Sequence, residues 1–131
     1  MSKVTFLRAQ NSKQKLNSIT DTLEKLLLDK KRALVVVPNE EALSFLDDHL
    51  WAYKPEAFLP HAIAKGPSKA PIVLSLTPDN FNQAEACLNL LPTPLPPQAA
   101  EKFPQVFELL DETSPEKKAL SRLKEEAWAS A

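Results

Sequence analysis

The apolar run from Ala33 to Val37 constrains the fold of this 131-residue chain more than any other segment. It reads Ala-Leu-Val-Val-Val, follows the basic stretch Lys30 to Arg32, and is ended by Pro38. A short β-branched run without polar alternation is typical of a strand that is covered on both faces. Such strands lie in parallel sheets with helices on each side, so the run predicts an α/β protein.

Predicted helices lie on either side of this run. Before it, Asn11 or Ser12 can cap a helix, because their side chains accept bonds from unpaired backbone N–H groups. Apolar residues at three- and four-residue steps form one stripe along that helix: Leu16, Ile19, Leu23, Leu26 and Leu27. After the run, Asn39 caps a second helix, whose inward residues are Ala42, Leu43, Leu46 and Leu50. With a first strand at Val4 to Arg8, the alternation indicates a right-handed crossover in a parallel sheet.

Three further strands are predicted: Ile72 to Leu76, Ala86 to Leu91, and Val106 to Leu110. Only about nine residues join the first two of them, whereas a parallel crossover usually takes a dozen or more. That pair is therefore expected to be antiparallel. The prediction is a three-layer, Rossmann-like α/β fold with a mixed, mainly parallel sheet of four to five strands, in one domain over residues 1–131.

A last helix is predicted to begin after Ser114, which can cap it. Its predicted inward face consists of Ala119, Leu120, Leu123 and Ala127. Lys118 and Arg122 lie four residues apart on one face, and a neighbouring stripe carries Lys117, Ser121, Lys124 and Trp128. This pattern suits an acidic peptide that ends in a carboxylate, which arginine can grip through two parallel hydrogen bonds. The alternative is a merely solvated helix, since Glu125 and Glu126 partly cancel the positive field.

Composition excludes several classes of protein. The formal net charge is −1, so strong direct binding to nucleic acid is not expected. Gly66 is the only glycine, whereas common phosphate-binding loops need several for tight turns and close backbone approach. No apolar run reaches the roughly 18 residues of a membrane span, and the first residues do not read as a signal peptide. With Cys87 as its only cysteine, the chain is expected to be cytoplasmic, with no membrane partner.

The residues that could carry catalysis do not form a recognisable site. His49, His61 and Cys87 lack the close paired spacings of zinc ligands, and there is no Gly-x-Ser-x-Gly element. Acidic pairs fall at helix ends and turns, where capping or solvation explains them. We therefore expect no metal, no cofactor and no enzymatic activity.

The stretch from Leu50 to His61 carries the clearest functional signal. It holds Trp51, Tyr53 and Phe58 on a backbone that two prolines keep out of regular structure. Tryptophan and tyrosine are enriched in the central residues of protein–protein interfaces. The segment therefore predicts a docking surface, with a cluster packed beneath the loop as the alternative. Both hold if some of these side chains face inward and others outward.

The same stretch resembles the hallmark loop of the chi subunit of bacterial DNA polymerase III. Leu50 and Trp51 stand at the end of the second predicted helix, as Leu-Trp does in that family, and the segment Phe58 to His61 follows as Phe-x-Pro-His. Further similarities run in order along the chain: Thr5-Phe6 in the first strand, Ala33 to Val37 before the second helix, Gly66-Pro67, and Leu120-Ser121-Arg122 with Ala127-Trp128 in the last helix.

The resemblance implies a non-catalytic accessory subunit of the replicative polymerase. Chi subunits bridge the acidic C-terminal tail of the single-stranded DNA-binding protein to the psi subunit of the clamp-loader assembly, and in some members the loop surface binds an accessory helicase. The predicted psi or helicase surface comprises Trp51, Tyr53, Phe58, Leu59, Pro60 and His61. The predicted tail site comprises Arg122, which the resemblance assigns, with Lys124, Lys118 and Trp128. Glu125 departs from the family pattern and would oppose an acidic tail.

A different class of function remains open from the sequence. The chain could be a degenerate α/β nucleotide-binding domain or enzyme that uses a pocket without a glycine-rich loop. A cleft at the carboxyl ends of the parallel strands, with convergent polar groups, would favour that alternative.

Overall fold

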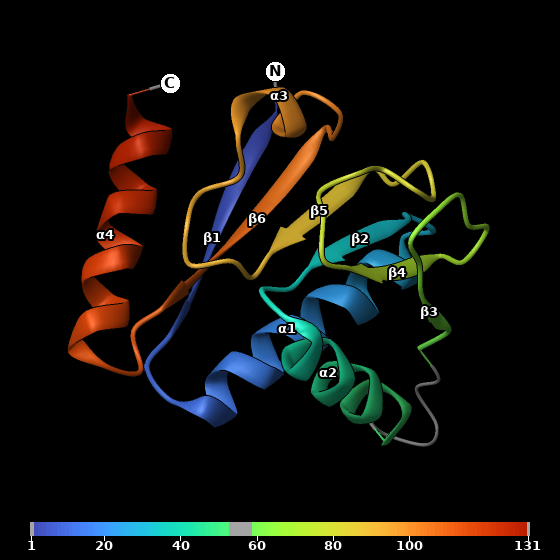
Figure 1. The fold of residues 1–131 in the computed structure, drawn as a ribbon, viewed down its shortest axis with the longest axis horizontal. Helices are drawn as coiled ribbons and strands as arrows, with labels where there is room; N and C mark the ends of the chain where they lie inside the picture. Colours follow the sequence, from blue (N-terminus) through green and yellow to red (C-terminus); the bar gives the residue numbers. More distant parts are fainter. Residues whose placement is uncertain (1, 53–58, 131) are drawn as a thin grey trace.

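The computed structural model describes residues 2–52 and 59–130, which form an α/β fold (Figure 1). Its elements in chain order are β1 (Lys3–Ala9), α1 (Ser12–Leu28), β2 (Ala33–Val36), α2 (Glu40–Ala52), β3 (His61–Ile63), β4 (Ile72–Ser75), β5 (Ala86–Asn89), α3 (Pro97–Ala100), β6 (Gln105–Asp111) and α4 (Pro115–Ala129). Six strands form one sheet in the order β1-β6-β5-β2-β4-β3, and every described strand pair is parallel. The predicted fold class is confirmed.

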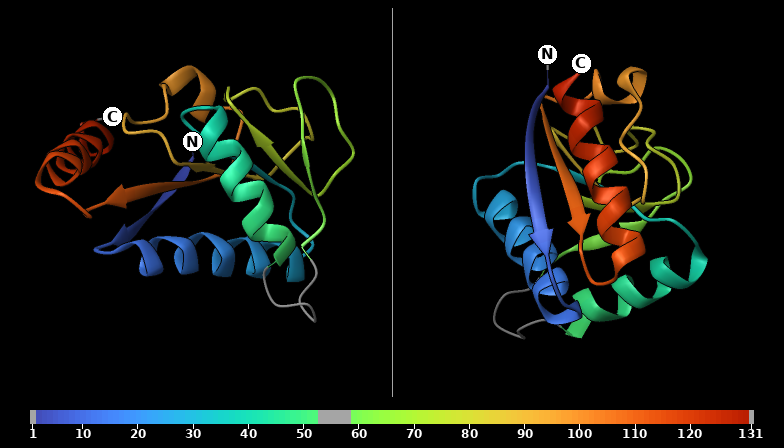
Figure 2. Two further views of the ribbon diagram at one scale, coloured as in Figure 1. Left: turned by 60° about the horizontal axis from the view of Figure 1, so that its bottom comes forward. Right: turned by 90° about the vertical axis from the view of Figure 1, so that its left-hand side faces the viewer.

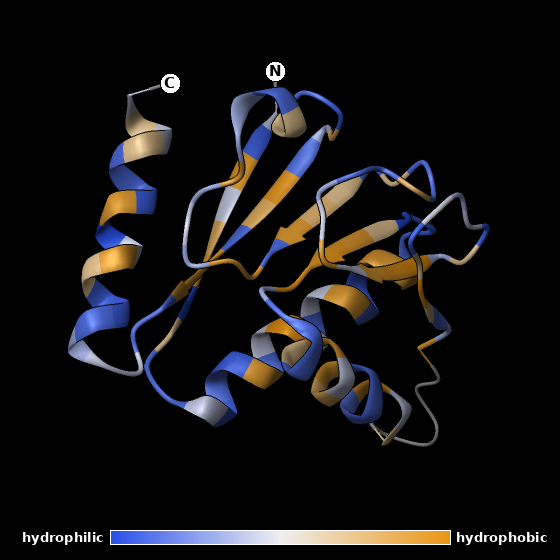
Figure 3. Ribbon diagram, viewed as in Figure 1, coloured by the Kyte–Doolittle hydropathy of each residue, from blue (hydrophilic) through white to orange (hydrophobic). Residues whose placement is uncertain are grey.

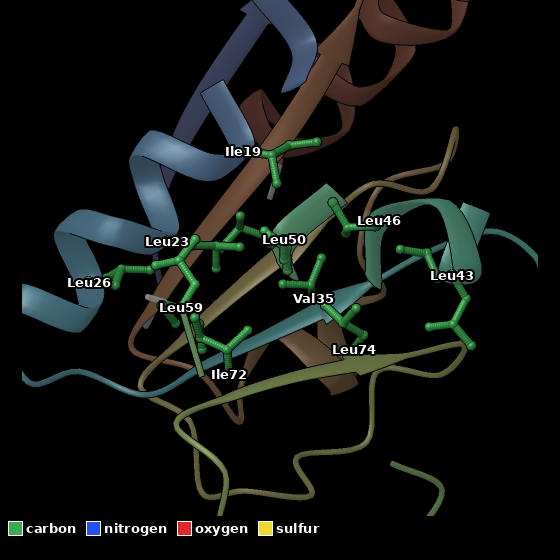
Figure 4. Packing of buried hydrophobic residues seen from close by; sticks show 14 residues of the cluster. Ile19, Leu23, Leu26, Val35, Leu43, Leu46, Leu50, Leu59, Ile72 and Leu74 are labelled. Carbon is green, nitrogen blue, oxygen red and sulfur yellow. The ribbon is translucent and has the colours of Figure 1, made fainter. Parts of the chain in front are cut away.

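Strand β2 is buried on both faces, as its apolar run predicts. Ala33, Val35 and Val37 belong to the hydrophobic cluster beneath α1 and α2, which Figure 4 shows from close by. Leu34 and Val36 point the other way, into a second cluster. The five residues are at most 1% exposed, so the centre of the sheet is sealed on each side.

Helices on both faces make three layers. Leucines of α1 and α2 cover one face of the sheet. The other face is covered by α3, by irregular segments and by Trp128 near the end of α4. Figure 2 shows α1 on one side of the sheet and α3 and α4 on the other. Helix α1 begins where predicted, because Asn11 Oδ1 accepts a 2.9 Å bond from the Gln14 N–H.

The expected antiparallel pair does not exist, because β2 lies between β4 and β5 and is parallel to both. Residues 76–85 make this crossover without a helix. When extended, they span about 33 Å, well beyond the roughly 16 Å needed to return along a four-residue strand and move two strand positions. Asn82 fixes the segment: its Nδ2 donates to the Ala33 carbonyl at 3.1 Å and the Ala70 carbonyl at 3.0 Å. The usual minimum of a dozen residues applies to crossovers that contain a helix, so it does not exclude a parallel arrangement here.

Strand β3 was not predicted, so the sheet has one strand more than the upper expectation. It is three residues long and lies at the edge of the sheet, where only β4 pairs with it. His61 pairs with Ile72 in that register. A strand this short carries too little alternation to be recognised from sequence.

The predicted inward face of α4 is wrong. Leu120 is 38% exposed and Leu123 is 56% exposed, whereas Ser121 and Lys124 are buried. Ala119 and Ala127 are exposed as well. Figure 3 shows this helix with hydrophobic and hydrophilic bands side by side, in contrast to the largely hydrophobic central strands. The helix is therefore held by polar contacts and leaves leucines outside.

Candidate protein-interaction surfaces

The end of α2 presents the first candidate surface. Asn39 Oδ1 accepts a 2.8 Å bond from the Ala42 N–H, and two glutamates stand in the first turn, where the helix dipole favours negative charge. Leu50 is 1% exposed and ends the buried stripe of the helix. Trp51 is the next residue, about 100° further around the helix, and so leaves the core. It is 54% exposed.

The exposed indole lies on a buried histidine. The ring centroids of Trp51 and His61 are 4.2 Å apart, with an angle of 40° between the planes. His61 Nδ1 lies 2.7 Å from the carbonyl oxygen of Leu59, and Nε2 lies 3.0 Å from Asp47 Oδ1. The structure thus brings Trp51 and His61 together, one at the surface and one beneath it.

The other predicted loop residues that the structure describes are buried or partly buried. Leu59 is 1% exposed and belongs to the cluster under α1 and α2, so it does not lie on the surface. Pro60 is partly buried. Tyr53 and Phe58 lie outside the described residues. The segment therefore combines an outward Trp51 with an inward Leu59, so its side chains face both ways, and a docking role for Trp51 stays a prediction.

Sequence reasoning missed two exposed hydrophobic residues near this end of the molecule. Phe45 is 58% exposed and stacks on His49 at a centroid distance of 6.3 Å, and Ile63 is 46% exposed. Phe45 lies outside the buried stripe of α2, and this position in the helical pattern could have predicted its exposure. Helical geometry places it on the opposite flank of α2 from Trp51. It therefore offers a separate apolar spot.

The second candidate surface is set by a buried carboxylate in β6. Glu108 is 0% exposed and points toward α4. Its Oε1 accepts bonds from Asn89 Nδ2 at 2.9 Å and from Lys124 Nζ at 3.2 Å. Its Oε2 accepts bonds from the Leu95 N–H and from Trp128 Nε1, each at 2.8 Å. Four donors therefore satisfy the carboxylate, and two of them come from α4.

Two residues of the predicted tail site, Lys124 and Trp128, bind the buried Glu108 carboxylate. Lys124 is 2% exposed, and its Nζ also donates to the Leu109 carbonyl at 2.9 Å. Burial lowers the pKa of Lys124, although the charge of Glu108 acts in the opposite direction. Trp128 is partly buried and gives its indole N–H to Glu108. The structure thus separates Lys124 from the surface that carries Arg122, since the ammonium group faces the sheet.

Arg122 and Lys118 remain on the outside of α4. Both are exposed, and neither side chain makes an ion pair with any residue that the structure describes. Glu125, which departs from the family pattern, is paired: its Oε2 lies 2.7 Å from Arg8 Nη2. Arg8 also lies 3.3 Å from Glu112. The negative charge beside Arg122 is thus partly neutralised by β1.

A groove runs along the carboxyl ends of the central strands, where the alternative function would require a cleft. One hollow of about 230 Å³ is lined by residues of α4 and of the segments after β2 and β5, and a second hollow leads on between α1 and α2. Lys15, Pro38 and Leu90 line both. The charged groups here pair with one another: Asp111 Oδ2 lies 3.0 Å from Lys15 Nζ and 3.7 Å from Lys117 Nζ.

Asp111 is held ionised by these contacts. Burial alone would raise its pKa, but bonds from the Thr113 hydroxyl and N–H and the charge of Lys15 outweigh burial and lower it to about 2. A carboxyl group with so low a pKa does not suit proton transfer near neutral pH. Asp111 instead joins the start of α4 to α1.

Replacement of Asp111 by asparagine is expected to lower the free energy of unfolding by about 2 kcal/mol at pH 7. The carboxyl pKa is depressed in the folded state, so its stabilisation is complete above the ordinary value of 3.8 and is lost as the pH falls toward 2. The difference between the two proteins should therefore shrink between about pH 4 and pH 2 in urea unfolding experiments. A difference that is constant with pH would show that the ionised carboxylate is not responsible.

The described residues offer no metal site. Among residues 2–52 and 59–130, no three His, Cys, Asp or Glu side chains cluster as ligands. Cys87 is buried, and burial raises the pKa of its thiol, so it is unreactive in the folded state. None of the described helices has the length and apolar character of a membrane span.

Comparison with known proteins decides the family. The family model described as DNA polymerase III chi subunit, HolC, matches residues 1–130. The chain belongs to the chi subunit family of DNA polymerase III. It is also similar to the DNA polymerase III subunit chi of Pseudomonas aeruginosa, with 35% identity over 74 residues. That match covers 56% of this chain and 51% of the relative, so the chain spans about half the length of the curated relative it matches.

Family membership gives the two surfaces a context. It confirms the resemblance seen in the hallmark loop and places the chain among the proteins of DNA replication. Chi is a non-catalytic accessory subunit, which agrees with the expectation that the chain is not an enzyme. The exposed Trp51 and Arg122 therefore stand as candidate contacts with other subunits.

Proposed function

We propose that this chi-family chain joins two replication proteins at separate surfaces. The outside of α4 receives the acidic C-terminal tail of the single-stranded DNA-binding protein. The surface around Trp51 receives the psi subunit, or an accessory helicase in its place. In this role the protein works in the cytoplasm as part of the polymerase holoenzyme and converts no substrate.

The observation that carries the proposal is the orientation of α4. A helix in a globular protein normally turns its apolar residues inward. Here Lys124 and Ser121 are buried, while Leu120 and Leu123 are exposed, and Leu123 is the residue next to Arg122. Apolar surface next to a guanidinium without an ion pair among the described residues suits a peptide whose last residue is apolar and ends in a carboxylate.

The charges around Arg122 support an acidic ligand. Lys118 lies one helical turn before Arg122 and adds a second exposed positive charge on the same face. Glu125 and the exposed Glu126 would both repel an acidic tail, and the bond of Glu125 to Arg8 compensates one of these two charges. The proposed tail site is therefore Arg122 with Lys118 and Leu123, without Lys124.

Replacement of Arg122 by alanine is expected to weaken binding of an acidic peptide ending in phenylalanine at least tenfold, which corresponds to about 1.4 kcal/mol. A fluorescently labelled peptide titrated with the purified protein gives the dissociation constant by anisotropy. Binding to the unchanged protein should also weaken as salt rises, because exposed charge pairs are screened.

A matched control is Lys69→Ala, which removes an exposed positive charge between β3 and β4, on the far part of the sheet from α4. It should leave the dissociation constant unchanged. If Arg122→Ala binds the peptide as tightly as the unchanged protein does, the tail site does not lie on α4.

A further inference from the structure

The buried His61 side chain lies between two oxygen atoms, beneath the exposed Trp51 indole. The side chain is 0% exposed, although imidazole is a polar group that costs free energy to bury without partners. Each ring nitrogen faces an oxygen atom: Nδ1 lies 2.7 Å from the Leu59 carbonyl, and Nε2 lies 3.0 Å from Asp47 Oδ1. Both distances are those of hydrogen bonds.

These two oxygen partners determine how many protons the imidazole ring of His61 needs for both hydrogen bonds. A carbonyl oxygen only accepts, so Nδ1 must donate to Leu59. A neutral ring would then present a lone pair at Nε2 to the carboxylate of Asp47, which is also an acceptor. The Asp47 side chain is 27% exposed, so its carboxylate also reaches solvent. With Nδ1 donating to the Leu59 carbonyl, a hydrogen bond to the Asp47 carboxylate requires a second proton at Nε2, and such a ring carries a positive charge.

The same elements hold Trp51 over this charge. Asp47 and Trp51 are four residues apart on α2, so both side chains lie on the face of the helix that looks toward β3. Asp47 binds the edge of the imidazole, and the indole covers the ring at 4.2 Å. A cation within about 6 Å of an indole face is attracted to it. On the β4 side His61 pairs with Ile72, which has no charge.

We propose that His61 is a positioning residue for the partner surface: its doubly protonated ring, fixed by Asp47 and the Leu59 carbonyl, holds the exposed Trp51 indole in one orientation. The inference rests on the proposed function only in that Trp51 is the partner-binding residue. A side chain that is already ordered loses less conformational entropy on binding. An exposed tryptophan held in this way is suited to a rigid, preformed interface.

Protonation of His61 can be measured directly by NMR. In protein with 15N-labelled histidine, a long-range 1H–15N spectrum at pH 7 distinguishes imidazolium from the neutral tautomers. The chain has two histidines, so the His61→Gln variant assigns the signals. We expect both nitrogens of His61 to show the imidazolium pattern, and we expect Asp47→Asn to convert the ring to a neutral form at the same pH. A neutral ring in the unchanged protein would overturn the proposal.

The orientation of Trp51 needs a second readout. With 5-fluorotryptophan the protein gives two 19F resonances, from Trp51 and Trp128, which a Trp51→Phe variant assigns. Asp47→Asn should shift and broaden the Trp51 resonance and leave that of Trp128 in place. Asp48→Asn, which changes the neighbouring exposed carboxylate, is the matched control and should alter neither.

An unchanged Trp51 resonance in folded Asp47→Asn protein would overturn the positioning role, and circular dichroism establishes that the variant is folded. These spectra are recorded without any partner. A failure of the proposed interactions with psi or with the acidic tail would therefore leave them unaffected, and the two proposals fail separately.

Discussion

Replacement of Glu108 by alanine is expected to lower the free energy of unfolding by about 3–5 kcal/mol. The change leaves the buried ammonium of Lys124 without its counter-charge, and it also removes the acceptor for Trp128 Nε1 and the Leu95 N–H. Removal of one member of a buried ion pair costs far more than the pair contributes, because the remaining charge is buried alone. Urea unfolding at pH 7, followed by circular dichroism, measures the loss.

Two further variants serve as controls for Glu108→Ala. Glu126→Ala removes an exposed carboxylate from the same helix and should change stability by less than about 0.5 kcal/mol. The double variant Glu108→Leu with Lys124→Met removes the unpaired buried charge and should recover part of the loss, although the Leu95 N–H, Trp128 Nε1 and Asn89 Nδ2 still lack this acceptor. If Glu108→Ala is as stable as Glu126→Ala, the carboxylate does not anchor α4.

The strands and helices with local signals could be predicted from the sequence. The run from Ala33 to Val37 identified β2 and its two covered faces. The apolar stripe of α1 and its Asn11 cap were also recognised, because both depend on residues close in sequence. Strands β4, β5 and β6 were placed from short apolar runs. The arrangement of β4 and β5 was wrong, because it depends on where a third strand inserts.

Helix α4 shows why its inward face could not be predicted. Its leucines repeat at helical spacing, which normally marks the buried side. The decisive residue, Glu108, lies in β6, and its carboxylate needs donors that only Lys124 and Trp128 supply from α4. A requirement set by a residue in another element is invisible to local periodicity. The same contact explains why Lys124 was misplaced among the residues exposed with Arg122.

The residues of the predicted docking segment differ in exposure. Trp51 is exposed as expected, because it follows the last buried leucine of α2. His61, predicted as a contact residue, lies beneath the indole, since its two polar partners come from Asp47 and from the Leu59 backbone. Neither partner can be inferred from residue spacing alone. The sequence thus placed both residues in one segment, and the structure separates the exposed Trp51 from the buried His61.

Replacement of Trp51 by alanine is expected to weaken capture of the psi subunit by about thirtyfold or more, which corresponds to a loss of about 2 kcal/mol. The indole is 54% exposed and held against His61, so it offers a large, ordered apolar surface to a partner. Co-expression with a tagged psi subunit, followed by titration of the purified proteins, measures the effect. The melting temperature should change little, because most of the side chain lies outside the core.

Phe45→Ala is the matched control for that experiment. Phe45 is 58% exposed on the same helix, but on its opposite flank, so its removal should leave psi binding intact. Equal losses in both variants would indicate a general weakening of α2 rather than a surface centred on Trp51. Unfolding of the Trp51→Ala protein would show that the indole supports the core. Selective loss of binding in a folded protein is the result that a docking role for Trp51 requires.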